Sequence, residues 1–192
     1  MTITEQERET YDTVWQFNEY RVRSPGARHL PAFLDMISSV DKARRGTILD
    51  AGCGGGKGAL ALRDEGFKVS MCDLSIEGLD PETIDANLPF FQTCLWKPLK
   101  QTVGMFDWVY CADVIEHIPP TFAMLVVQRL LECALRGVFI STCFVEENHG
   151  VWIGKQLHQT VQGFTDWRDQ LNEVGHVQEA RDLGLWGLYL VK

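Results

Sequence analysis

The feature that most constrains the fold of this chain is a glycine-rich loop between an apolar run and a helical segment. Residues 50–58 read Asp-Ala-Gly-Cys-Gly-Gly-Gly-Lys-Gly, and the apolar run at 47–50 before them ends on the acid Asp50. Such a run is typical of a short buried strand. Glycines in a strand-to-helix turn allow positive φ angles and close approach of a ligand, and the helix N-terminus offers amide donors. The loop therefore predicts an α/β domain that binds a ligand at a strand end.

The spacing of these glycines excludes two classes of ligand-binding loop. A nucleoside-triphosphate loop needs glycine where Ala51 stands and a hydroxyl residue where Gly58 stands. The dinucleotide fingerprint needs a third glycine where Lys57 stands. A turn without any ligand is less favoured, because turns rarely need this many glycines after a buried acid.

The rest of the chain alternates short apolar runs with helical segments. Two N-terminal helices are expected, one through Tyr11 and Trp15 and one after Ser24-Pro25-Gly26, and later helices at about 120–135 and 164–174. Strands are expected at 67–72, 90–94, 106–111, 138–142, 177–182 and 185–191. This alternation predicts a mostly parallel α/β sheet that is covered on both faces.

A second acid stands where a nucleoside ligand needs one. Asp73 follows the expected strand at 67–72 and lies 19 residues after Gly54. An acid at this place accepts hydrogen bonds from ribose hydroxyls. By itself such an acid is more often a cap or turn residue, but together with the glycine loop it indicates a nucleoside-containing cofactor.

Residues 106–120 carry a further motif, Phe-Asp-Trp-Val-Tyr-Cys-Ala-Asp-Val-Ile-Glu-His-Ile-Pro-Pro. With the Asp-x-Gly-x-Gly-x-Gly loop and Asp73, the chain resembles the class I S-adenosylmethionine-dependent methyltransferases, in the small-molecule type with an Asp-Val-Ile-Glu-His fourth motif. The resemblance covers roughly residues 45 to 191. It implies a Rossmann-like, mostly parallel seven-stranded sheet with helices on both faces and an antiparallel last strand, and S-adenosyl-L-methionine as cofactor.

The resemblance also assigns residues to the cofactor site. The cofactor-binding residues that it implies are Asp50, Gly52, Gly54, Asp73, Leu74, Cys94, Leu95, Cys111 and Ala112. The backbone at Cys111 and Ala112 would border the methionine end. Many relatives carry Asp where Cys94 stands, and a thiol forms only weak hydrogen bonds. We therefore expect the adenine to be held by backbone groups and by packing on Leu95.

Methyl transfer needs an acceptor positioned in line and often a base for the departing proton. The candidate catalytic residues are His117, His158 and Glu116. In one interpretation His117 or His158 is the general base. In a second, a helical turn aligns Asp113, Glu116 and His117, which with His158 hold a metal ion, a pattern that resembles the small-RNA 2′-O-methyltransferases. In a third, the Glu-His pair only caps the strand and bonds to the scaffold. No metal is favoured.

The acceptor class follows in part from charge. The chain has 18 Lys and Arg against 26 Asp and Glu, a formal charge of -8, which disfavours a large polyanion. We expect methyl transfer to an oxygen or nitrogen of a small or carrier-borne metabolite. The alternatives are a metal-dependent RNA 2′-O-methyltransferase-like enzyme and a non-catalytic S-adenosylmethionine-binding protein. No DNA partner is expected, and RNA stays open.

The length and the hydrophobic content of 45% suit one domain over residues 1–192. Residues 1–44 are expected to form an N-terminal helical lid or substrate segment, and residues 45–192 the cofactor-binding core. Within these, Trp15 to Arg21 is the expected lid and 144–156 an expected loop over the site. The chain has a polar N-terminus, no long apolar run, and cysteines without metal-ligand spacing. These features predict a cytoplasmic protein without a membrane span. We expect a monomer or homodimer.

Overall fold

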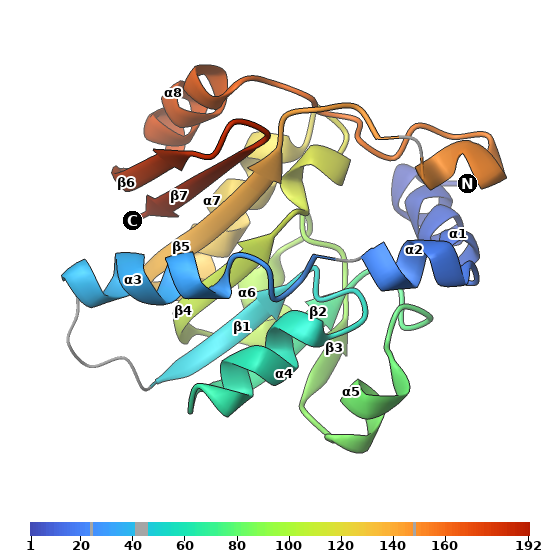
Figure 1. Cartoon of the computed structure of the whole chain (residues 1–192), viewed down its shortest axis with the longest axis horizontal. Coiled ribbons are helices and arrows are strands. Elements are labelled where there is room, and N and C mark those ends of the chain that lie inside the picture. Colours follow the sequence, from blue (N-terminus) through green and yellow to red (C-terminus); the bar gives the residue numbers. More distant parts are fainter. Residues whose placement is uncertain (24, 41–45, 148) are drawn as a thin grey trace.

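The computed structural model describes residues 1–23, 25–40, 46–147 and 149–192. Within these residues seven strands form one sheet in the order β3-β2-β1-β4-β5-β7-β6 (Figure 1). The strands are β1 (Thr47–Ala51), β2 (Lys68–Asp73), β3 (Phe90–Gln92), β4 (Phe106–Ala112), β5 (Ala134–Cys143), β6 (Val177–Asp182) and β7 (Trp186–Val191). Strands β1 to β5 pair in parallel, and β7 runs antiparallel to both β5 and β6. The Rossmann-like sheet with an antiparallel last strand is confirmed.

Helical segments precede the sheet and alternate with its strands. They are α1 (Ile3–Val14), α2 (Asn18–Arg23), α3 (Leu30–Val40), α4 (Lys57–Asp64), α5 (Pro81–Asp85), α6 (Leu99–Val103), η1 (Ile115–His117), α7 (Ala123–Cys133), η2 (His149–Ile153) and α8 (Phe164–Val174). None of the described helices is long and apolar enough to cross a membrane.

The sheet is covered by helices on both faces, because neighbouring strand residues point to opposite sides. Ile48 belongs to a buried cluster with residues of α3 and α4, whereas Leu49 belongs to a cluster with residues of α6, α7 and α8. Figure 1 shows α3 and α4 in front of the sheet and α7 behind it. The apolar strand composition thus reflects burial on both sides.

Two expected boundaries are corrected. The helix expected at about 120–135 spans only Ala123–Cys133, and β5 begins at Ala134 without an intervening loop. Apolar residues continue across this junction, so their periodicity does not show where the helix ends. The strand expected at 90–94 ends at Gln92, which leaves Cys94 in the following turn. Ser24 and the expected boundary between residues 44 and 45 lie outside the described residues.

Helices α1 and α2 lie beyond the carboxyl ends of the parallel strands (Figure 1). Three side-chain interactions hold α2 against the loops of this edge. The Arg21 guanidinium donates to the Gly78 carbonyl at 2.8 Å and forms an ion pair with Asp80 at 3.2 Å. The Lys57 ammonium, at the start of α4, donates to the Arg21 carbonyl at 2.9 Å. The N-terminal helices therefore face the strand ends, where α/β sheets bind their ligands.

Candidate functional site

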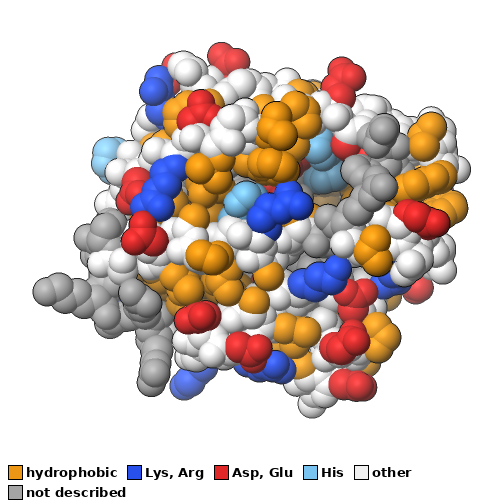
Figure 2. Space-filling model, viewed as in Figure 1, with side chains coloured by type: hydrophobic (Ala, Val, Ile, Leu, Met, Phe, Trp, Pro, Cys, Tyr) orange, Lys and Arg blue, Asp and Glu red, His pale blue; other side chains and the backbone are white. Residues whose placement is uncertain are grey.

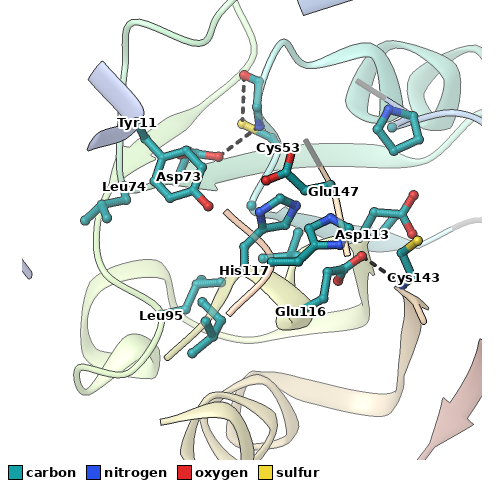
Figure 3. Close-up of a pocket in the computed structure, with 18 of the residues that line it drawn as sticks. Tyr11, Cys53, Asp73, Leu74, Leu95, Asp113, Glu116, His117, Cys143 and Glu147 are labelled. Atoms are coloured by element: carbon teal, nitrogen blue, oxygen red, sulfur yellow. Dashed lines mark hydrogen bonds between the residues drawn. The ribbon is translucent and has the colours of Figure 1, made fainter. Parts of the chain in front are cut away.

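A cavity of about 740 Å³ lies at the carboxyl edge of the sheet, between the strand ends and the N-terminal helices (Figure 3). Its walls come from α1, the glycine loop, the ends of β2 and β4, and the loop after β5. Histidine side chains lie beside Lys and Arg side chains near the middle of the face shown in Figure 2. Of the cofactor-binding residues predicted from the sequence, the cavity is lined by Asp50, Gly52, Gly54, Asp73, Leu74, Cys94, Leu95 and Ala112.

The glycine loop is bound directly to the acid at the end of β2. The Gly54 amide donates to Asp73 Oδ2 at 2.9 Å, and the Ser75 amide donates to Asp73 Oδ1 at 3.0 Å. Burial raises the pKa of Asp73, and these amide bonds oppose the rise. Each carboxylate oxygen keeps a lone pair for a further donor. Asp73 is therefore placed to accept hydrogen bonds from a ligand with hydroxyl groups.

The loop also depends on glycine for its shape. Gly52 has a φ of 75°, and a Cβ atom there would lie 2.6 Å from a methyl group of Val114. Gly54 has a φ of 51°, in the left-handed region, and directs its amide at Asp73. A side chain at either position would strain the backbone or push the loop away from β4.

Asp50 lies beneath the first turn of α4 and is 4% exposed. Its Oδ2 atom has no hydrogen-bond partner among the described residues. Burial, followed by the charge of Asp73, raises the pKa of Asp50 to about 7, while a hydrogen bond from the Ala59 backbone lowers it. A cationic ligand in the cavity would favour ionisation of this acid.

The β3 end of the cavity is apolar. Leu74 and Leu95 line it together with Cys94, whose Sγ accepts a weak hydrogen bond from the Thr4 hydroxyl at 3.9 Å. Burial raises the pKa of Cys94, so the thiol stays protonated. Ala112 lines the cavity, whereas the Cys111 side chain packs in the cluster on the α7 side of the sheet. A flat apolar group such as a nucleobase suits this end.

The three predicted catalytic residues come together on the wall between β4 and the loop after β5. Figure 3 labels two of them, Glu116 and His117. Glu116, His117 and His158 each offer a ligand atom within 4.8 Å of the others. The two imidazole rings meet edge to face, with centroids 4.6 Å apart. Since a carbonyl only accepts, the 2.7 Å contact from His158 Nδ1 to the Val145 carbonyl places the proton on Nδ1. The lone pair of neutral His158 is therefore on Nε2.

Glu116 is fully buried behind the two histidines. Its Oε1 atom accepts a hydrogen bond from the Cys143 amide at 2.9 Å, whereas Oε2 has no hydrogen-bond partner in the described part of the chain. Burial and the nearby charge of Asp113 raise the pKa of Glu116 well above its usual value. The protonated carboxyl can donate a hydrogen bond, and a bound cation would displace its proton.

Asp113 does not join this cluster. It has a φ of 54°, and η1 begins only at Ile115, so the expected helical alignment of Asp113 with Glu116 and His117 is wrong. The Ser141 hydroxyl donates to Asp113 Oδ1 at 2.8 Å, and Oδ2 lies 3.8 Å from His29 Nε2. Burial lowers the pKa of His29 to about 4, so this imidazole is neutral at pH 7 and the contact is not an ion pair. Burial raises the pKa of Asp113 to about 6.

The N-terminal segment and the loop after β5 cover the side of the cavity that lies away from the sheet. Trp15 and Tyr20 of the expected lid line it, with ring centroids 4.8 Å apart. Tyr11 also lines it, edge-on to His117 at 6.0 Å, and its buried hydroxyl has no partner among the described residues. The Gln159 amide donates to Glu7 Oε2 at 3.0 Å, which joins α1 to the segment beside His158.

Sequence reasoning missed lining residues such as Glu7, Arg28 and Trp186, and it expected Glu147 only as part of the loop at 144–156. Each belongs to a helix, loop or strand outside the motifs, as Glu7 does in α1 and Trp186 at the start of β7. The only signal for Tyr11 is its place on the apolar face of α1. A motif search has no means of finding such residues, because their role depends on tertiary contacts.

Comparisons with known proteins agree on one family. The family described as "Methyltransferase domain" matches residues 17–186. The ubiquinone biosynthesis O-methyltransferase of Vibrio campbellii is 29% identical over 100 residues, which are 50% of this chain and 43% of that protein. The chloroplastic magnesium protoporphyrin IX methyltransferase of Arabidopsis thaliana is 32% identical over 102 residues, which are 50% of this chain and 32% of that protein. These matches span less than half the length of the curated relatives.

Solved structures show the same fold at low identity. The magnesium protoporphyrin IX methyltransferase of Synechocystis with bound SAH aligns with a TM-score of 0.70 at 18% identity, over 98% of this chain and 99% of that one. The 1,6-didemethyltoxoflavin-N1-methyltransferase of Burkholderia thailandensis aligns with a TM-score of 0.69 at 15% identity, over 100% and 90%.

Proposed function

The chain belongs to the methyltransferase domain family, and on that premise we propose that it transfers a methyl group from S-adenosyl-L-methionine to an oxygen or nitrogen of a small or carrier-borne metabolite. The observation that carries the proposal is the hydrogen bond between the glycine loop and Asp73, both of which line a cavity of about 740 Å³. The glycine backbone lets the cofactor approach closely, and Asp73 offers acceptors for its ribose hydroxyls.

Each end of the cavity suits one part of this cofactor. Leu74 and Leu95 would pack against the adenine, with Cys94 beside it. Ala112 lines the cavity and would border the methionine end, whereas Cys111 does not line it. A sulfonium is a cation, so the acids Asp50 and Asp73 favour its binding electrostatically.

The acceptor would bind next to His117 and His158. Bound S-adenosyl-L-methionine would supply an electrophilic methyl group, and the acceptor atom that takes this methyl group would have to give up a proton. The Nε2 lone pair of His158 is placed to take that proton, and His117 lies against it. Glu116 would hold this wall in position through its bond to the Cys143 amide.

One observation favours a second candidate, a divalent cation held by Glu116, His117 and His158, as in a metal-dependent RNA 2′-O-methyltransferase-like enzyme. The three ligand atoms are mutually within 4.8 Å, and Glu116 Oε2 is buried without a hydrogen-bond partner in the described residues. A cation there would lower the pKa of an acceptor hydroxyl. Asp113 is not part of this set.

Cofactor binding is tested by calorimetry and thermal shift with S-adenosylhomocysteine. Wild type should be stabilised, and Asp73→Asn should bind about 10- to 100-fold more weakly, because a charged acceptor for two hydroxyls is lost. Asp64→Asn is the matched control, since Asp64 is exposed on α4 outside the cavity. Absence of binding to wild type would overturn the proposed function.

Catalysis is tested by transfer of labelled methyl groups to the small-molecule fraction of a cell extract. His158→Gln should lower the rate by about 10²- to 10⁴-fold while S-adenosylhomocysteine affinity is kept. Loss of transfer after chelation, restored by added cation, would favour the metal candidate. Cofactor binding without transfer to any fraction would indicate a non-catalytic binding protein.

We also propose a cytoplasmic location and a monomer or homodimer. The location is supported by the six cysteines, all of them free and buried as expected for a reducing compartment.

A further inference from the structure

The charges that line the cavity are unequal. Arg28 is the only arginine or lysine among the described lining residues, and its guanidinium stacks over the Trp186 ring, 4.8 Å from the ring centroid. Burial raises the pKa of Asp113, and the nearby Arg28 charge opposes the rise, so these two side chains offset each other. No second lysine or arginine stands among the described lining residues to offset the acids of the covering segments, which include Glu7 of α1 and Glu147 after β5.

Two of the lining residues, Glu7 and Tyr11, lie four positions apart on α1 and therefore on the same face of that helix. The Gln159 side-chain amide donates to Glu7 Oε2 at 3.0 Å and to the His117 carbonyl at 3.2 Å, which fixes Glu7 beside η1. The Tyr11 ring meets the His117 ring edge to face, with centroids 6.0 Å apart. Figure 3 shows Tyr11 projecting into the cavity. Both side chains thus lie where the proposed acceptor would bind.

Glu7 and Tyr11 keep hydrogen-bonding capacity that the described protein groups do not use. The Tyr11 hydroxyl is buried and has no hydrogen-bond partner among the described residues. Glu7 is half-buried, and Gln159 is the only described residue that donates to its carboxylate. Burial is the largest cause of the raised pKa of Glu7, while the Gln159 bond and the charge of Lys155, which does not line the cavity, oppose the rise. Such a pair suits a ligand that brings its own donors and a positive charge.

We propose that Glu7 and Tyr11 bind a positively charged amine carried by the methyl acceptor. An ammonium group has several N–H donors, of which one would bond to the Glu7 carboxylate and another to the Tyr11 hydroxyl oxygen. The face of a tyrosine ring also attracts cations. The inference rests on the proposed function, because it places the amine beside His117 and His158, where the acceptor would bind.

The same arrangement disfavours an acceptor with an anionic group at this place. A carboxylate or phosphate would be repelled by Glu7 and the other acids of the covering segments, and the charge of Arg28 is already offset by Asp113. Glu7 and Tyr11 also precede residues 17–186, the part of the chain that matches the methyltransferase domain family. A pair outside the shared domain can determine the choice of acceptor, whereas the residues proposed for the cofactor lie inside that domain.

The experiment measures the binding of three probes that share a phenylethyl group and differ in charge, which are 2-phenylethylamine, 2-phenylethanol and 3-phenylpropanoate. Calorimetry at neutral pH gives their affinities for wild type, Glu7→Gln and Tyr11→Phe, with and without saturating S-adenosylhomocysteine. Glu7→Gln removes the charge and keeps an oxygen for the Gln159 amide, and Tyr11→Phe removes only the hydroxyl. Glu9→Gln is the matched control, since Glu9 is exposed on the same helix and does not line the cavity. Thermal unfolding of each variant reports that it is folded.

Wild type should bind the amine about 10-fold or more tightly than the carboxylate, and Glu7→Gln should remove most of this preference, because a charge-assisted hydrogen bond is lost. The affinity for the alcohol should change much less. Tyr11→Phe should weaken the amine about 2- to 10-fold, as expected for the loss of one hydrogen bond. Glu9→Gln should keep the wild-type preference.

Equal affinity of wild type for the amine and the carboxylate, or an amine affinity that Glu7→Gln or Tyr11→Phe leaves unchanged, overturns the inference. If Glu7 only ties α1 to Gln159, Glu7→Gln lowers the thermal stability and does not alter the preference, which also counts against it. A wild type that does not bind S-adenosylhomocysteine contradicts the proposed function instead, and the preference measured without S-adenosylhomocysteine still decides on Glu7 and Tyr11.

Discussion

At the scale of single residues, burial governs the acids of the cavity more than their mutual spacing does. Desolvation is the largest cause of the raised pKa at Asp50, Asp113 and Glu116. The protein therefore keeps proton-bearing carboxyls in a cavity where an ionised set would repel itself. A cationic ligand relieves that repulsion and draws the protons off, so ligand binding and proton release are coupled.

The raised pKa of Asp50 should make the free energy of unfolding depend on pH, even in the ligand-free protein. Its pKa is about 7 in the folded protein against an ordinary 3.8, so between these values the folded state holds more protons than the unfolded state. The free energy of unfolding from this group is thus highest at low pH and falls as the pH rises to about 7. Compared with Asp50→Asn, wild type should lose roughly 1 to 4 kcal/mol between pH 4 and 8.

The measurement is urea unfolding of both proteins across that pH range. Both contain His29, whose lowered pKa acts in the opposite direction, so its contribution cancels in the difference. Parallel pH profiles of the two proteins would contradict the assignment.

Whether a site residue could be predicted from the sequence depends on how far away its partners lie along the chain. The closeness of Gly54 and Asp73 could be predicted, because Gly54 follows β1, Asp73 ends the neighbouring parallel strand β2, and a short spacing along the chain carries the signal. The separation of Asp113 from Glu116 could not, because it follows from a left-handed backbone angle and from the Ser141 hydroxyl on another strand. Arg28 was missed for the same reason, since only tertiary contact brings Trp186 beneath it.

At the scale of elements, the apolar pattern of the sequence predicts the sheet and the longer helices that cover it, but it does not predict the short helices. Strand runs and amphipathic helices have periods that the sequence displays. Helices α2, α5 and α6 are only five or six residues long, too short to show a period. The junction of α7 and β5 is hidden because both elements are apolar there.

The cover formed by α1 and η2 is expected to tighten when the cofactor binds. Phe17, in the connection between α1 and α2, stacks on Trp152 of η2 with centroids 5.8 Å apart. Amide hydrogen exchange in residues 3–14 and 149–153 should slow with S-adenosylhomocysteine, and α8, away from the cavity, should not change. Phe17→Ala should speed exchange in α1 about 2- to 10-fold, because a stacked pair contributes about 0.5 to 1.5 kcal/mol. Exchange in α1 that is indifferent to both ligand and substitution would refute this role.

At the scale of the whole molecule, the two hydrophobic clusters share one sheet and should unfold together. Leu130 is fully buried on the α7 side, where Trp167 also packs, and Trp108 packs on the opposite side. Leu130→Ala should cost about 2 to 5 kcal/mol and shift a single transition seen equally by circular dichroism and tryptophan fluorescence. Leu135→Ala is the matched control, since Leu135 is 63% exposed and should change stability by less than about 0.5 kcal/mol. Two separate transitions would show that the faces unfold independently.

The contacts that close the cavity join distant parts of the chain. Lys155 bonds to the Thr10 hydroxyl across 145 residues, and Gln159 bonds to Glu7 across 152. Chain loops of this length close slowly, because the chain loses conformational entropy before the closing contacts form. The strands and helices that pack together in the sheet are closer in sequence, so they should meet sooner. In a refolding experiment the sheet should therefore form first and the binding cavity last, so that native-like secondary structure returns before ligand affinity does.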